Sequence, residues 1–186
     1  DVTQIPLEAD AAFLDPSRRT DGRRVVKLLQ VSPPLEFIRR LTESIPNSAV
    51  KLSPATDYTE LEALGGEIEF ISESGECKEA LVWFGAFKTT SRRATILPGR
   101  HTMEHQPVPE ISVSQPGKYL YEPDPCVIRA HLVENLAHQI GAWKIDSRIA
   151  YLTSSEPVET PFADAYEVVD VLPFNLKAIH RRLREL

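Results

Sequence analysis

The chain has 186 residues, of which 42% are hydrophobic and 26% are charged, and its formal net charge is −6. These proportions are typical of a globular protein, and the length suits one large domain or two small ones. No apolar run approaches the roughly 20 residues that a membrane-spanning helix needs. The negative charge argues against nonspecific binding to polyanions, which requires clustered cations.

The first predicted element is a short apolar strand at residues 11–14, which ends at Asp15-Pro16. Ser32-Pro33-Pro34 then opens a predicted helix, with serine as the cap and proline in the first turn. Its apolar stripe consists of Leu35, Ile38, Leu41 and Ile45, which recur at helical spacing. Residues 48–52 predict a buried strand, and residues 59–64 predict a short helix that Gly65-Gly66 ends.

Two further strands are predicted at residues 67–72 and 78–84, around the turn Ser74-Gly75-Glu76. Because so few residues connect them, they form a hairpin and are antiparallel. Four prolines between residues 98 and 117 indicate a loop-rich linker.

The second half of the chain predicts a smaller unit with both helices and strands. A long helix is expected from Asp124-Pro125 to Gly141, and Asn175 is expected to cap a final helix. Strands are predicted at residues 149–153 and 166–172. The fold class is therefore α/β, divided into a first part at residues 1–97, a linker at 98–117 and a small α+β domain at 118–186.

The segment Ala11-Ala12-Phe13-Leu14-Asp15-Pro16-Ser17-Arg18-Arg19 resembles the fourth motif of class I S-adenosylmethionine-dependent methyltransferases, Asp/Asn-Pro-Pro-X. Residues 92–98, 119–125, 149–153 and 171–175 look like segments of a bacterial family in which a THUMP-like domain follows the catalytic domain. The resemblance implies the C-terminal half of a Rossmann-like sheet that ends in an antiparallel hairpin, followed by a THUMP-like domain.

The same resemblance implies an activity and a partner. S-adenosyl-L-methionine would be the cofactor of the complete enzyme, and the substrate would be RNA, either tRNA or rRNA. The chain would begin inside the catalytic domain and stop short within the THUMP-like domain. Residues 1–186 alone would then be inactive and bind the cofactor weakly or not at all.

Site residues follow from the resemblance position by position. In amine methyltransferases, the acid and a backbone carbonyl of this loop orient the target amine, which assigns catalytic roles to Asp15 and Pro16. Ser17 and Arg18 replace the usual second proline and aromatic residue, although a guanidinium can stack on a base or bind a phosphate. The substrate-binding residues are expected to be Ser17, Arg18, Arg19, Lys51 and Pro54, and Asp1 is expected to contact the cofactor.

Other interpretations of these residues stay open. Asp-Pro-X-Arg also occurs in RNA uridine C5-methyltransferases, but these need a cysteine after the next strand, and here that strand ends Lys51-Leu52-Ser53-Pro54. A nitrogen acceptor is therefore preferred. Asp15 could instead be an ordinary turn acid, Lys51 a lysine at the rim of the sheet and Asp1 a surface acid. A non-catalytic RNA-binding or interaction module is the alternative function.

The remaining features predict the setting of the protein. Cys77 and Cys126 are too few for a disulfide framework, and the histidines lack the spacing of a metal site. Asp1 to Asp10 lack the features of a signal peptide, so a cytoplasmic location without membrane partners is expected. An exposed sheet edge is also expected, and such an edge favours self-association.

Overall fold

The computed structural model describes residues 2–5, 7–17, 19–20, 23–24 and 28–185. Its largest element is a six-stranded mixed sheet with the order β1-β4-β6-β5-β7-β8. Strands β1, β4, β5 and β7 run in one direction, and β6 and β8 run in the other. The strands are β1 (Ala12–Leu14), β4 (Ser48–Leu52), β5 (Glu67–Glu73), β6 (Glu76–Trp83), β7 (Arg92–Leu97) and β8 (His101–Glu104).

The predicted hairpin is confirmed, because β5 and β6 pair in antiparallel fashion. Its turn contains Ser74 and Gly75, both with positive φ angles, which suits the twist of a tight hairpin. Strand β6 also pairs with β4, so the second strand of the hairpin, and not the first, lies next to β4 in the sheet. Strand β1 pairs only with β4 among the described residues and is the predicted edge.

Helix α1 (Leu35–Ser44) covers the edge of this sheet. Its buried Phe37 and Leu41, with Ile45 just after it, pack against Ala12 and Leu14 of β1. The expected serine cap is wrong: the N-cap is Pro34, without a side-chain hydrogen bond. Helix α2 (Tyr58–Glu62) is instead capped by a side chain, because Asp57 accepts a hydrogen bond from the Thr59 amide.

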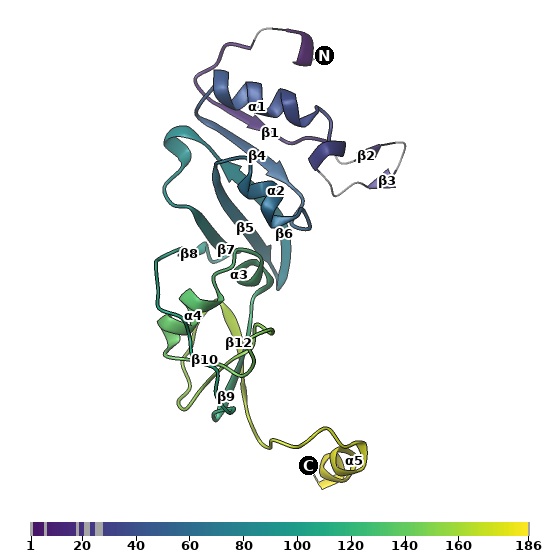
Figure 1. The fold of residues 1–186 in the computed structure, drawn as a ribbon, viewed down its shortest axis with the longest axis vertical. Helices are drawn as coiled ribbons and strands as arrows, with labels where there is room; N and C mark the ends of the chain where they lie inside the picture. Colours follow the sequence, from purple (N-terminus) through teal and green to yellow (C-terminus); the bar gives the residue numbers. More distant parts are fainter. Residues whose placement is uncertain (1, 6, 18, 21–22, 25–27, 186) are drawn as a thin grey trace.

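A second, four-stranded antiparallel sheet has the order β10-β11-β9-β12. One continuous cluster of buried side chains joins the two sheets, from Phe70 and Val82 to Tyr121 and Leu152. Figure 1 shows the two sheets following one another along the long axis of the molecule. The strands and helices of this part are β9 (Tyr119–Pro123), α3 (Pro125–Arg129), α4 (Val133–Ile140), β10 (Trp143–Lys144), β11 (Leu152–Ser154) and β12 (Ala163–Glu167).

The expected long helix between Asp124 and Gly141 is wrong, because α3 and α4 are separate helices. His131 adopts a φ of 54°, and the amides of His131 and Leu132 donate to the carbonyls of Ile128 and Val127. This pattern is a Schellman motif, in which a histidine takes the place that glycine usually occupies.

Two other expectations need correction. Strand β8 lies inside the segment expected to be a loop-rich linker, where it pairs with β7. The strand expected at residues 166–172 is β12, which ends at Glu167. The final helix is confirmed as α5 (Leu176–Glu185), with the Asn175 side chain accepting from the Ala178 amide.

The smaller elements are a two-stranded ribbon and three short 3-10 helices. They are β2 (Arg19–Thr20), β3 (Arg23–Arg24), η1 (Val2–Gln4), η2 (Leu28–Gln30) and η3 (Gly85–Phe87). In the described ranges, no helix is both long and apolar enough to cross a membrane.

Candidate active site

Asp15 and Lys51 meet where the parallel strands β1 and β4 end. The register pairs Leu14 with Val50, so the residue after each lies at the same edge of the sheet. The Nζ atom of Lys51 lies 3.1 Å from Oδ2 of Asp15 and 3.3 Å from Oε1 of Glu79. The carboxyl ends of parallel strands are where ligands bind in open α/β sheets, so this edge is the candidate site.

Electrostatics at this edge keep Lys51 charged. The hydrogen bond to Asp15, supported by Glu79, raises the pKa of Lys51 above its ordinary value of 10.5. The side chain of Asp15 is 53% exposed, whereas that of Lys51 is only 27% exposed. Asp15 is therefore oriented by a cation on one side and open to a ligand on the other.

The loop after Asp15 is held by the backbone. The Ser17 amide donates to the Ser32 carbonyl at 2.7 Å, and the Ser32 amide donates to the Ser17 carbonyl at 3.0 Å. Pro16 is buried between two exposed neighbours, Asp15 and Ser17. Asp15 lies between the end of β1 and the bridge of Ser17 with Ser32, so its backbone is held on both sides and its carboxylate is preorganised.

A tight turn follows β4 at the neighbouring strand end. The Thr56 amide donates to the carbonyl of the buried Ser53 at 3.0 Å, and Pro54 between them is half-buried. Arg129 of α3 donates from Nη2 to the Thr56 carbonyl at 2.7 Å. A residue of the second half of the chain thus braces the loop that carries Pro54.

The structure therefore brings five predicted residues to one edge of the sheet: Asp15, Pro16, Ser17, Lys51 and Pro54. Asp1 and Arg18 lie outside the described residues, and for Arg19 only its backbone place in β2 is described. Sequence reasoning missed Glu79. Glu79 lies on a strand that was predicted, β6. Its contact with Lys51 could be predicted only if β6 were known to lie next to β4.

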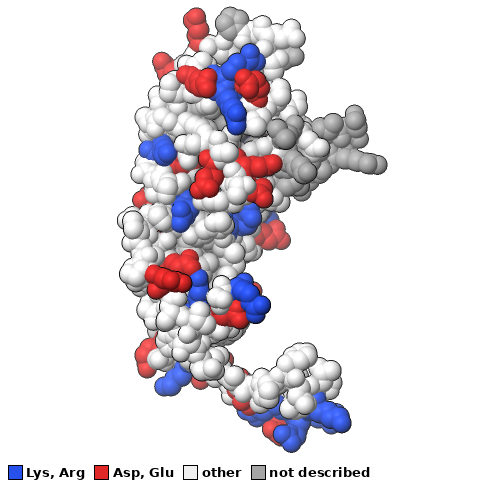
Figure 2. Space-filling view, viewed as in Figure 1, with Lys and Arg blue, Asp and Glu red and all other residues white. Residues whose placement is uncertain are grey.

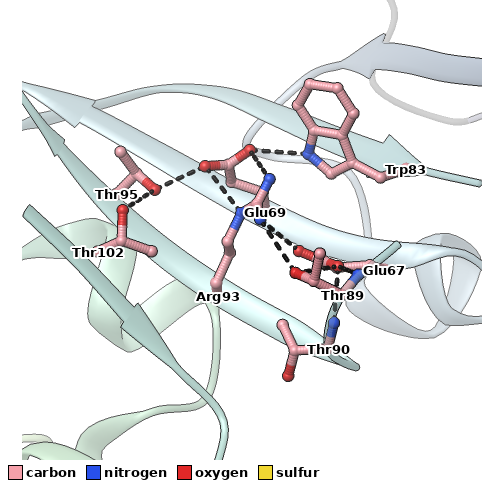
Figure 3. A network of polar contacts seen from close by, with 8 residues as sticks. All are labelled: Glu67, Glu69, Trp83, Thr89, Thr90, Arg93, Thr95 and Thr102. Atoms are coloured by element: carbon pink, nitrogen blue, oxygen red, sulfur yellow. Dashed lines mark hydrogen bonds and ion pairs between the residues drawn. The ribbon is translucent and has the colours of Figure 1, made fainter. Parts of the chain in front are cut away.

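A second polar network lies deeper in the sheet (Figure 3). The Arg93 guanidinium lies 3.0 Å from Oε1 of Glu67 and 3.1 Å from Oε1 of Glu69, and both glutamates are buried. Glu67 also accepts from the backbone amide of Thr90, and Glu69 accepts from the Trp83 indole. These ion pairs and hydrogen bonds link side chains of β5, β6 and β7, so the network joins the three strands and serves the fold.

The cysteines are poor candidates for nucleophiles. Burial raises the pKa of the Cys77 thiol to about 11, and it raises the pKa of Cys126 further. Both thiols are therefore protonated near neutral pH, whereas the reactive form is the thiolate. Across the ranges that the structure covers, no three His, Cys, Asp or Glu side chains are grouped as a metal site.

The comparisons with known proteins point to one enzyme class. The chain is 34% identical over 187 residues to two proteins of Mycobacterium tuberculosis, each named an uncharacterised S-adenosylmethionine-dependent methyltransferase. The match covers 97% of this chain and 50% of each relative, so the chain spans about half the length of the curated relatives it matches. No family model matches the chain.

A solved structure shares the fold. It is described as a "putative methyltransferase" from Porphyromonas gingivalis and superimposes with a TM-score of 0.71 at 22% sequence identity. The match covers 95% of this chain and 47% of that chain. Together with the curated relatives, this likeness supports the predicted relationship to S-adenosylmethionine-dependent methyltransferases.

Proposed function

We propose that this chain works as part of a cytoplasmic S-adenosylmethionine-dependent methyltransferase that methylates a nitrogen of an RNA base, in tRNA or rRNA. The observation that carries the proposal is the exposed Asp15 carboxylate, which the Lys51 amine orients at the carboxyl end of β1. The names of the two curated relatives support the same reaction class.

The proposed chemistry uses Asp15 and Pro16 to position the acceptor. When bound, S-adenosylmethionine supplies an electrophilic methyl group on its sulfonium. The Asp15 carboxylate and the Pro16 carbonyl accept hydrogen bonds from the N–H groups of the target amine, which directs the nitrogen lone pair toward that methyl group. As the new N–C bond forms, the bond between the methyl group and sulfur would break and the sulfonium would leave as a neutral thioether, while the Asp15 carboxylate would accept the excess proton from nitrogen.

These residues fit the acceptor side of such a site. The sequence contains no Gly-X-Gly spacing, and no described residue is assigned to the methionine or ribose of the cofactor. The proposed cofactor contact, Asp1, lies outside the described residues.

The RNA part of the proposal depends on the residues that follow Asp15 and on the second sheet. Arg18 and Arg19 follow the candidate catalytic pair after one intervening residue, Ser17, and their guanidinium groups can stack on a base or bind a phosphate. Residues 118–186 contain a four-stranded antiparallel sheet with two helices beside it, which agrees with a small α+β module. We interpret this part as a THUMP-like domain.

The deciding experiment is methyl incorporation from labelled S-adenosylmethionine into total tRNA and rRNA, using the protein produced from its complete gene. We expect Asp15→Ala to reduce turnover by about 100-fold or more, because the target amine loses the side chain that orients it, while cofactor binding persists. Asp10→Ala is the matched control, because Asp10 is an exposed aspartate just before β1. Near-normal turnover of Asp15→Ala would remove the catalytic role of this residue.

A second measurement separates the enzyme from the alternative, a non-catalytic RNA-binding or interaction module. Replacing Arg18 and Arg19 by alanine should weaken RNA binding and make its salt dependence shallower, because phosphate contacts are lost. RNA binding without any methyl incorporation would favour the binding module. An unchanged salt dependence would show that the two arginines do not contact RNA.

A further inference from the structure

Helix α5 carries an apolar stripe that no other described segment buries. Leu176, Ile179 and Leu183 recur at helical spacing, and Leu176 and Leu183 are 62% and 64% exposed. Phe174, just before the helix, is 91% exposed. Figure 1 shows α5 standing apart from both sheets, at the end of an extended segment. A contiguous apolar surface of this kind marks an interaction site.

The borders of this stripe are basic. Lys177 and Arg184 follow Leu176 and Leu183 by one residue and therefore lie beside the stripe on the same flank. Arg182 lies on the opposite flank, where it pairs with Asp170 at 2.8 Å. In Figure 2 basic side chains gather on α5, whereas basic and acidic side chains are interspersed over the two sheets.

A groove of complementary character lies beside α3. Its volume is about 780 Å³, and a second groove of about 590 Å³ adjoins it through Pro161 and Ala163. The apolar lining of the larger groove includes Ile96, Leu97, Pro123, Pro125 and Ile128. Its acidic residues are Glu122, Asp124 and Asp164.

Two of these acids lie opposite one another. Glu122 of β9 and Asp164 of β12 are direct cross-strand partners, an arrangement in which like charges destabilise a sheet. No ion pair involves either carboxylate within the part of the chain that is described. The Arg129 guanidinium also lines the groove, but it donates to the Thr56 carbonyl and lies over the Phe70 ring. Its lining therefore contains three acids and one cation, which leaves the groove with an excess of negative charge.

We propose that α5 of one copy of this chain lies in the acidic groove of a second copy, and that α5 of the second copy lies in the acidic groove of the first. The apolar stripe would cover the apolar lining, while Lys177 and Arg184 would neutralise Glu122 and Asp164. Two equivalent contacts related by a twofold axis close into a dimer and use both surfaces completely. This interface is distinct from the edge of β1, and it does not depend on the proposed function.

Charge reversal tests this pairing. The helix variant carries Lys177→Glu and Arg184→Glu, and the groove variant carries Glu122→Lys and Asp164→Lys. In each variant alone, helix and groove have the same sign of charge, so we expect the dimer dissociation constant to rise by roughly tenfold or more. In an equimolar mixture, each helix meets a groove of opposite charge, and heterodimers should form with the original affinity.

The masses are measured by sedimentation velocity over a range of concentrations, with circular dichroism to verify that each variant is folded. Arg39→Glu with Arg100→Glu is the matched control for the helix variant, because it makes the same change in net charge at two exposed positions elsewhere. A chain that stays monomeric would overturn the proposal, as would a dimer that both reversals leave unchanged. Failure of the mixture to restore the dimer, or binding of α5 to RNA or anionic vesicles by a monomer, would also overturn it.

Discussion

The Lys51 amine lies 3.1 Å from the Asp15 carboxylate and 3.3 Å from the Glu79 carboxylate, so one cation holds two acids from strands on either side of it. The hydrogen bond to Asp15 is the main reason that the pKa of Lys51 is raised. The stability from this pairing is present below pH 10.5 and is lost as the pH rises through the higher pKa of the folded state.

We predict that Asp15→Asn lowers the pKa of Lys51 toward 10.5, because the hydrogen bond to the Asp15 carboxylate is the largest single cause of the raised value. Glu79→Gln should shift the pKa of Lys51 in the same direction, because Glu79 also forms a hydrogen bond with the amine. The measurement is a pH titration of the Lys51 side-chain amine by NMR in the chain itself. A titration that does not respond to Asp15→Asn would contradict the contact.

Loss of Lys51 should affect turnover more than binding. In the protein from the complete gene, we expect Lys51→Met to lower kcat by roughly tenfold, because Asp15 loses the group that orients it and positioning carries the rate. Lys51→Arg should keep most of the activity. Separate measurements of kcat and KM test this, and a change confined to KM would instead indicate that Lys51 contacts the substrate.

Removing the cation of the buried network should destabilise the fold. Arg93→Met leaves Glu67 and Glu69 buried without a counter-charge, which typically costs about 3–5 kcal/mol of the free energy of unfolding. Arg39→Met, at an exposed position of α1, should cost far less. Urea unfolding compares the two variants, and equal losses of stability would show that the network does not hold the sheet together.

His131 should make the fold sensitive to acid. Desolvation, together with Arg92 and Arg129, lowers the pKa of His131 below its ordinary value of 6.5. The unfolded chain therefore binds this proton more readily, and stability is lost as the pH falls below about 6.5. His131→Asn removes this loss and retains a residue type that tolerates the positive φ.

The free energies of unfolding of the wild-type chain and His131→Asn should be compared at pH 7.5 and pH 5.5. Loss of the stacking between His131 and Tyr58, whose ring centroids are 4.0 Å apart, should cost similar stability at both values. The difference between the two proteins should nevertheless shift in favour of the variant at the lower pH. A difference that is the same at both pH values would contradict the lowered pKa.

The 186-residue chain should bind S-adenosylmethionine weakly or not at all. It offers residues for the acceptor side of the site, but it has no Gly-X-Gly spacing that could shape a cofactor loop. Calorimetric titration measures this directly, and the protein from the complete gene provides the comparison. Tight binding in a one-to-one ratio by residues 1–186 would overturn this assignment of Asp15 to the acceptor side.

The elements that sequence predicted best are those with local signals. Turn residues at Ser74 and Gly75 predicted the β5–β6 hairpin, and apolar spacing predicted α1. The break between α3 and α4 was missed because His131 adopts a left-handed backbone conformation, which a histidine in the sequence does not predict. The site was predicted in part. Asp15 and Lys51 were expected to lie close together because each was assigned to the end of a strand, and these two strands were expected to be neighbours in the sheet.

Long-range pairing explains what sequence could not predict. Glu79 meets Lys51 only because β6 inserts between β4 and β5, and nothing local to Glu79 indicates that order. Glu67 and Glu69 alternate along β5 like residues on a solvent-facing side of a strand. They are buried because Arg93 of β7 lies between them, which depends on how the parallel pair β5–β7 is aligned.

Arg129 has an evolutionary consequence. It enters from the second half of the chain, donates to Thr56 in the loop after β4 and covers the ring of Phe70. A recombination event that replaced everything after β8 with an unrelated module would leave that carbonyl without its donor and that ring uncovered. The two halves are therefore expected to be inherited together, and a substitution at Arg129 should select for compensating changes near Thr56.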